Sequence, residues 1–170
     1  KRQLQVTEGS EWMPQTSKNE NTIQFNYFMG DQLINIKYRD GRKNFKLYKG
    51  AEKVFYNINS VVGYDWCVVV EGEMDVLALH EAGIKNAISV PNGATLNTNN
   101  LDYLDNCIDY LDDKTKIILA VDADAAGQAL RTEFIRRLGA EVCYLVDFNG
   151  QKDANEYLIE NGAEALRNAI

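Results

Sequence analysis

From Trp66 onward, short apolar runs alternate with stretches of helical spacing, and this order limits the possible folds more than any other feature. The runs at 67–70, 86–90, 116–121 and 141–146 are rich in β-branched residues, as buried parallel strands are. A stretch with helical spacing follows each run. We therefore predict an α/β fold, an open and mainly parallel sheet that is flanked by helices at 74–83, 101–111, 125–139 and 153–162.

The preceding residues alternate apolar and polar side chains, as half-buried strands do. The alternation runs through "TIQFNYF" at 22–28 and "LINIKYR" at 33–39. We expect Asp40-Gly41 to form a two-residue hairpin turn that pairs Ile36 with Phe45 on a buried face. On this register the opposite, cationic face carries Asn35, Lys37, Arg39 and Lys46, whereas Lys43 is turned away from it at the end of the turn.

These patterns divide the chain into four segments. Residues 1–21 are polar and without a period, so we expect a linker or a flexible end. A smaller, β-rich and basic N-terminal lobe is predicted for 22–65, and the α/β domain for 66–148. A C-terminal helical extension is predicted for 149–170.

Charge is distributed unevenly over these segments, although the net charge of −7 by itself argues against binding to nucleic acid. Residues 1–65 carry ten lysines and arginines and seven acids, whereas residues 66–170 carry eight and eighteen. This asymmetry suits a protein that holds a polyanion on its first half and metal ions on its second. The aromatic residues at 38, 45, 48, 55 and 56 interleave with basic ones; we expect most of them in the core and one or two to stack on nucleobases.

Several classes of protein are excluded by what the sequence contains. Its three cysteines are far apart and form no C-x-x-C pair, which excludes a cysteine zinc ribbon in this segment. The single histidine excludes most histidine-based metal sites and argues against a Ser-His-Asp triad. No run of about 18 apolar residues exists, so neither a transmembrane helix nor a membrane partner is predicted.

Acidic residues follow two of the predicted strands. Glu71 and Asp75 come after the first strand, and Asp122 and Asp124 after the third. If these strands are neighbours, Glu71, Asp122 and Asp124 meet at one edge of the sheet, where ligands bind in open α/β folds. A cluster of oxygen ligands without His or Cys selects Mg²⁺ or Mn²⁺, which suits phosphoryl or nucleotidyl transfer.

Each acid also has a simpler interpretation. As a single residue, Asp124 fits an N-cap of the next helix as well as it fits a metal ligand. Asp75 alone fits better as a first-turn acid that complements the helix dipole. Glu71 is harder to explain in this way, because a carboxylate at the end of a buried strand is costly unless it is paired. Gly72 is expected to allow a sharp turn after Glu71, and Gly127 to allow close packing of the third helix.

The two acidic motifs together resemble the Toprim signature, E-G-x-x-D after one strand and D-x-D-x-x-G after a later one. They stand here as "EGEMD" at 71–75 and "DADAAG" at 122–127. DnaG-type primases, topoisomerases and some nucleases share this signature. "KDANE" at 152–156 and the basic "IKYRDGRKNFK" at 36–46 extend the similarity to the primase half of phage-type and mitochondrial-type primase-helicases.

The resemblance implies the Toprim-domain catalytic core of a DNA primase, which makes short RNA primers on single-stranded DNA from nucleoside triphosphates with Mg²⁺ or Mn²⁺. Glu71, Asp122 and Asp124 are implied to be catalytic, and the same three residues together with Asp75 to bind the metal. The positions implied to hold triphosphate or nucleic acid are Lys37, Arg39, Lys43, Lys46, Asp153 and Asn155. Of these, Asp153 and Asn155 match a late acidic/amide motif that implies an outer metal or triphosphate contact.

The sequence departs from complete primases of this type in two respects. It has neither an N-terminal zinc ribbon nor a G-x-x-x-x-G-K-[ST] phosphate loop, so we expect it to be a catalytic core from a longer protein. A replicative helicase, fused or separate, is the expected partner. The scattered cysteines and polar start fit a cytoplasmic protein of a bacterial or phage-infected cell, with an organellar matrix as the alternative.

Three other hypotheses use the same residues. A Toprim nuclease would use these acids with water as the nucleophile, but the basic hairpin matches the primase arrangement instead. A non-catalytic module that binds nucleic acid is disfavoured because the acids are intact. A topoisomerase fits least, since it needs a tyrosine nucleophile in another domain.

Overall fold

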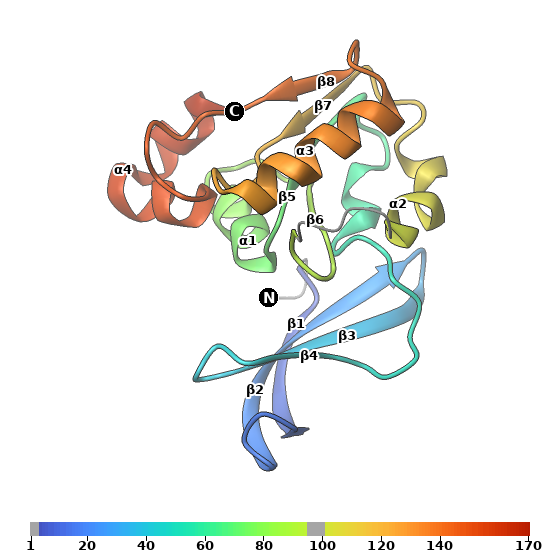
Figure 1. Ribbon diagram of the computed structural model, residues 1–170, viewed down its shortest axis with the longest axis vertical. Helices are drawn as coiled ribbons and strands as arrows, with labels where there is room; N and C mark the ends of the chain where they lie inside the picture. The colour runs from blue at the N-terminus through green and yellow to red at the C-terminus, as the bar shows by residue number, and fades with distance from the viewer. Residues whose placement is uncertain (1–3, 95–100) are drawn as a thin grey trace.

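Two β-sheets, one beneath the other in Figure 1, make up the framework of the computed structural model, which describes residues 4–94 and 101–170. The lower sheet is antiparallel, with its strands in chain order: β1 (Val6–Met13), β2 (Lys18–Met29), β3 (Gln32–Asp40) and β4 (Phe45–Leu47). The upper sheet is parallel, in the order β6-β5-β7-β8: β6 (Ala87–Ser89), β5 (Trp66–Val70), β7 (Lys116–Leu119) and β8 (Cys143–Leu145).

Helices follow the strands of the parallel sheet, as predicted. They are α1 (Glu73–Glu81), α2 (Asp102–Asn106), α3 (Ala125–Leu138) and α4 (Ala154–Ala169). Helix α3 runs along the sheet in Figure 1, and α1 packs against α4. Helix α4 is longer than predicted and is broken at Gly162, where φ is 83°. The α/β fold with an open parallel sheet flanked by helices is therefore confirmed, and so is the smaller β-rich lobe.

The two lobes share one hydrophobic core. Phe25 and Tyr27 of β2 are buried against Tyr56, with ring centroids 5.7 Å and 5.3 Å apart. Tyr56 also forms an isolated antiparallel bridge with Ser89 of β6, in the parallel sheet. The segment between the sheets thus packs on both of them, which holds the lobes in a defined relative position.

The predicted linker at 1–21 is wrong for most of its length. Residues 6–13 form β1, which pairs with β2 along its whole length, and residues 18–21 begin β2. Strand β1 lies at a sheet edge and most of its side chains are at least partly exposed, so it needs no regular alternation of apolar residues. Residues 1–3 of that segment lie outside the described residues. The other segment boundaries stay predictions.

The predicted two-residue turn at Asp40-Gly41 is also wrong. The loop between β3 and β4 is longer, because the Asp40 carboxylate accepts hydrogen bonds from the backbone N–H groups of Arg42 and Asn44, at 2.9 Å and 2.8 Å. Lys43 takes a positive φ of 63° within it. The longer loop shifts the register, so that Arg39 faces Phe45 and Lys37 faces Leu47.

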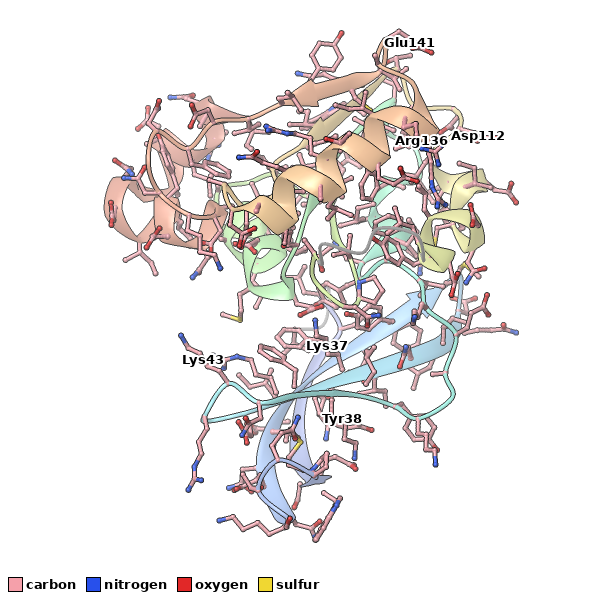
Figure 2. All side chains as sticks on the ribbon, in the orientation of Figure 1. Lys37, Tyr38, Lys43, Asp112, Arg136 and Glu141 are labelled. Atoms are coloured by element: carbon pink, nitrogen blue, oxygen red, sulfur yellow. The ribbon has the colours of Figure 1, made fainter. Side chains whose placement is uncertain are left out.

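This shift changes which side chains share a face of the β-lobe. Lys37 and Arg39 lie with Phe45 on the face turned toward the α/β domain, whereas Tyr38 lies on the opposite side (Figure 2). The predicted apolar inner face and cationic outer face are therefore wrong. Lys37 is buried, because β3 lies against the start of α1.

Candidate active site

The ends of β5 and β7 bring the two acidic motifs together. These strands are parallel neighbours, with Val69 beside Leu119, so Glu71 and Asp122 leave the sheet at the same edge. The sequence prediction required these two strands to be neighbours, and they are. Two backbone N–H groups, from Asp122 and Ala94, donate to the two Glu71 oxygens at 3.0 Å each.

Glu71 is unusually basic for a glutamate. Burial raises its pKa to about 7, and the negative charge of nearby Asp122 acts in the same direction. The two backbone hydrogen bonds oppose this shift without cancelling it. A carboxyl group with a pKa near neutrality is suited to give or take a proton at physiological pH.

Three aspartates lie close together at this edge. Oxygen atoms of Asp75, Asp122 and Asp153 lie within 4.8 Å of one another. Asp75 is held by the backbone N–H groups of Asn155, at 3.0 Å, and Gly72, at 3.2 Å. Asp153 accepts from the N–H of Glu156, at 2.8 Å, at the start of α4. We call these three residues the acidic trio.

The acidic trio fits a hard divalent cation. Burial and the charge of Asp153 raise the pKa of Asp75 to about 7, and burial also raises the pKa of Asp122. These shifts mark crowded negative charge that a cation would relieve. Since all three donors are carboxylates, without His or Cys, the donor set suits a divalent cation that prefers oxygen ligands.

The trio differs from the ligand set expected from sequence. Asp153, predicted as an outer metal or triphosphate contact, belongs to it, whereas Glu71 and Asp124 do not. Asp124 instead caps α3, accepting from the N–H groups of Ala126, at 3.0 Å, and Gly127, at 2.9 Å. The simpler interpretation of Asp124 therefore describes its contacts here, and its role as a metal ligand stays a prediction.

Gly127 packs so closely on the site that a side chain there would require its neighbours to move. A Cβ atom there would lie 2.2 Å from the backbone oxygen of Asp122 and 2.5 Å from Glu71 Oε1. The expected close packing is thus found, and it involves both acidic motifs. At Gly72, φ is −115°, which any residue adopts; a Cβ there would instead lie 2.9 Å from Asp75 Oδ2.

We predict that Gly127→Ala lowers the free energy of unfolding by about 1–3 kcal/mol, because the backbone and Glu71 must move to admit a methyl group. Urea unfolding measures this loss. Gly41→Ala is the matched control, since its Cβ meets nothing within 4 Å and its φ is not positive. Equal stability of the two variants would contradict the packing described here.

Cations line the opposite wall of the same cavity. This cavity, of about 590 Å³, lies between the β-lobe and the α/β domain and is lined by Lys37, Arg39 and Lys43 as well as by Glu71 and the acidic trio. Lys43 points toward it from the loop end of the β-lobe (Figure 2). Lys43 is exposed and Arg39 partly so, and both have charged groups available to an anion.

Lys37 and Lys46 also line this cavity, but each is paired with a glutamate. Lys37 Nζ lies 2.9 Å from Oε1 of Glu73, in a buried pair, and the Tyr27 hydroxyl donates to the same oxygen at 2.5 Å. Lys46 Nζ pairs with Glu11 and lies 5.4 Å from the centre of the Tyr38 ring, on the other face of the sheet. Lys46 therefore does not share a face with Lys37 and Arg39, contrary to the predicted register.

Two further residues of the site were not singled out from sequence. Glu73, the second glutamate of "EGEMD", is buried and joins α1 to the β-lobe through Lys37. Lys152, the first residue of "KDANE", pairs with Asp122 at 2.9 Å. Both lie inside quoted motifs, but neither motif indicates which residue pairs with the charge.

Within the described residues, no helix is both long enough and apolar enough to cross a bilayer.

Known proteins are similar to this chain in sequence and in fold. A family model described as Toprim-like matches residues 68–158. The primase homolog protein of Arabidopsis thaliana is 37% identical over 169 residues, covering 89% of this chain and 50% of that protein. The Twinkle homolog protein, chloroplastic/mitochondrial, of the same plant is 34% identical over 169 residues, covering 89% of this chain and 24% of that protein. The chain thus spans half or less of the length of these relatives.

A solved structure is similar over nearly the whole chain. The primase fragment of the bacteriophage T7 primase-helicase protein superposes with a TM-score of 0.77 at 23% identity, covering 97% of this chain and 66% of that one. Both the β-lobe and the α/β domain fall within this match. At this identity the likeness concerns the fold.

Proposed function

Since the chain belongs to the Toprim-like family, we propose that it is the catalytic core of a DNA primase. The reaction would be metal-dependent nucleotidyl transfer, making short RNA primers on a single-stranded DNA template. One observation carries this proposal: the acidic trio and the cationic side chains of Arg39 and Lys43 line a single cavity. A nucleoside triphosphate needs both, since its phosphates require cationic side chains and a divalent metal.

The acidic trio would hold Mg²⁺ or Mn²⁺. The ion would neutralise part of the negative charge of the triphosphate. Arg39 and Lys43 would bind the outer phosphates from the β-lobe. Lys37 stays a predicted phosphate contact, although its ammonium group is paired with Glu73. Asn155 lines the same cavity, and its backbone N–H orients Asp75.

Glu71 is our candidate for proton transfer. Bond formation between a 3′-hydroxyl oxygen and the α-phosphorus releases pyrophosphate, and the hydroxyl proton must leave. With a pKa of about 7, Glu71 can accept that proton at neutral pH. Its two backbone hydrogen bonds hold the carboxylate in place before the substrate arrives.

The names of the related proteins support this proposal and suggest partners. The plant relatives are called a primase homolog and a Twinkle homolog, and the T7 protein is called a primase-helicase. We propose a replicative helicase as partner of this chain on that ground. The name chloroplastic/mitochondrial belongs to one relative, and an organellar location of this chain is a proposal only.

Incubation of the chain with single-stranded DNA, the four nucleoside triphosphates and Mg²⁺ tests the proposed function. We expect short labelled RNA products from a labelled nucleotide, and unchanged DNA when the DNA is labelled instead. Shortened DNA would contradict the proposal in favour of a nuclease. DNA binding without either product would favour a non-catalytic module.

A further inference from the structure

Phe45 is a large apolar side chain in a cavity otherwise lined mainly by charged and polar groups. It begins β4, an edge strand of three residues, and 44% of its surface is exposed. Its backbone oxygen accepts a hydrogen bond from Gln15 at 2.8 Å, so the main chain at this point is anchored. The ring is not part of the shared core and lies at the cavity surface.

The cations of the cavity wall surround this ring. Arg39 lies directly opposite Phe45 in the β-ladder, and its guanidinium carbon is 6.0 Å from the ring centre. Lys37 Nζ is 5.2 Å from the same centre. An aromatic face beside cationic groups is the combination that binds a base and its phosphate together.

Apolar surface is present on the opposite wall as well. Met74 of α1 lines the cavity from the α/β domain and is 37% exposed, and Leu47 extends the apolar surface next to Phe45. A flat, apolar ligand between the two lobes would cover these side chains, while a free phosphate would leave them in water. The cavity therefore offers a place for a base as well as for phosphates.

The other aromatic residues that interleave with the basic ones, at 38, 48, 55 and 56, do not present an exposed ring to the cavity. Tyr38 lies on the opposite face of the sheet, and Phe55 and Tyr56 are fully buried in the core. Tyr48 is 58% exposed but does not line the cavity. Phe45 is thus the aromatic residue of this basic segment that meets the cavity with its ring exposed.

We propose that the Phe45 ring is a stacking surface for a nucleobase, whose attached phosphate is held by Arg39 and Lys43. The proposal rests on the proposed function, because a primase must hold bases of both a template and an incoming nucleotide. Stacking on an aromatic ring is tolerant of base identity, since every base has a flat π-face. Phe45 would therefore position a base without selecting among the four.

Binding measurements test this proposal: the two oligomers are measured in EDTA, which removes any metal held by the acidic trio, and ATP is measured in EDTA and again in Mg²⁺. The ligands are a labelled oligothymidylate, an abasic deoxyribose-phosphate oligomer of equal length, and ATP. For Phe45→Ala we expect affinity for oligothymidylate, ATP or both to fall by roughly tenfold, while affinity for the abasic oligomer is unchanged. Phe45→Trp should keep wild-type affinity, and Tyr48→Ala is the matched control outside the cavity.

Each outcome decides a separate question. Loss confined to ATP assigns the surface to the incoming nucleotide, and loss confined to oligothymidylate assigns it to the template strand. An equal loss for the abasic oligomer, or unchanged affinity for both base-carrying ligands, overturns the stacking proposal. If RNA products still form in that case, the proposed function stands; if the wild-type chain binds none of the ligands, both proposals fail.

Discussion

Replacement of Asp122 by asparagine is expected to lower RNA primer synthesis on the order of a thousandfold while the chain stays folded. The substitution removes one of the three carboxylates whose oxygens lie within 4.8 Å of one another. It also removes a negative charge from a site where burial already raises the pKa of Asp122, so the metal-free protein should lose no stability. Primer synthesis with labelled nucleotide and calorimetric unfolding with and without Mg²⁺ measure the two effects.

Two controls separate loss of metal binding from a general effect of charge. Asp112→Asn removes an exposed acid that lies away from the cavity (Figure 2) and should retain wild-type activity. Mg²⁺ should stabilise wild type and Asp112→Asn against heat but have a much smaller effect on Asp122→Asn. Wild-type activity of Asp122→Asn would rule out the acidic trio as the metal site.

Replacement of Lys37 by methionine is expected to destabilise the fold by about 3–5 kcal/mol. Methionine leaves Glu73, which is only 2% exposed, as a buried charge without its cation. Tyr27 still donates to Glu73, but a neutral hydroxyl does not replace an ammonium group. Urea unfolding measures the loss, and Lys43→Met, at an exposed position of the same cavity, should change stability by less than about 0.5 kcal/mol.

A double variant distinguishes an ion pair from loss of packing. Lys37→Met combined with Glu73→Gln removes both charges, and most of the lost stability should return. If the losses of the two single variants simply add, the pair is not the cause. A Lys37→Met variant as stable as Lys43→Met would show that the buried pair does not hold the β-lobe against α1.

Much of the parallel sheet and its active-site edge could be predicted from local pattern. The β-branched runs predicted β5, β6, β7 and β8, and the glycine after α3 marks its end at Gly139. The acidic motifs directly follow β5 and β7, so their meeting required only that these strands be neighbours. Residue patterns of this kind depend on short stretches of chain and can be recognised without the rest of the fold.

The edge strands of the β-lobe were less predictable. Strand β1 carries polar residues on both faces, which resembles a linker. The register of β3 and β4 depends on hydrogen bonds from the Asp40 carboxylate, which lengthen the loop. Because side chains alternate along a strand, this change placed Phe45 on the same face as Arg39 and moved Lys46 to the opposite one.

The sequence by itself determined that this chain forms a parallel α/β sheet with carboxylates after two of its strands, because strand periodicity and motif spacing are local properties. The tertiary structure decided which carboxylates meet. Asp124 and Asp153 both begin helices as N-caps, yet only Asp153 joins Asp75 and Asp122, since α4 packs against α1. Lys37, Arg39, Lys43 and Phe45 all line the cavity, and the tertiary structure also decided that Lys37 is paired there with Glu73, because such partners are set by how the lobes dock.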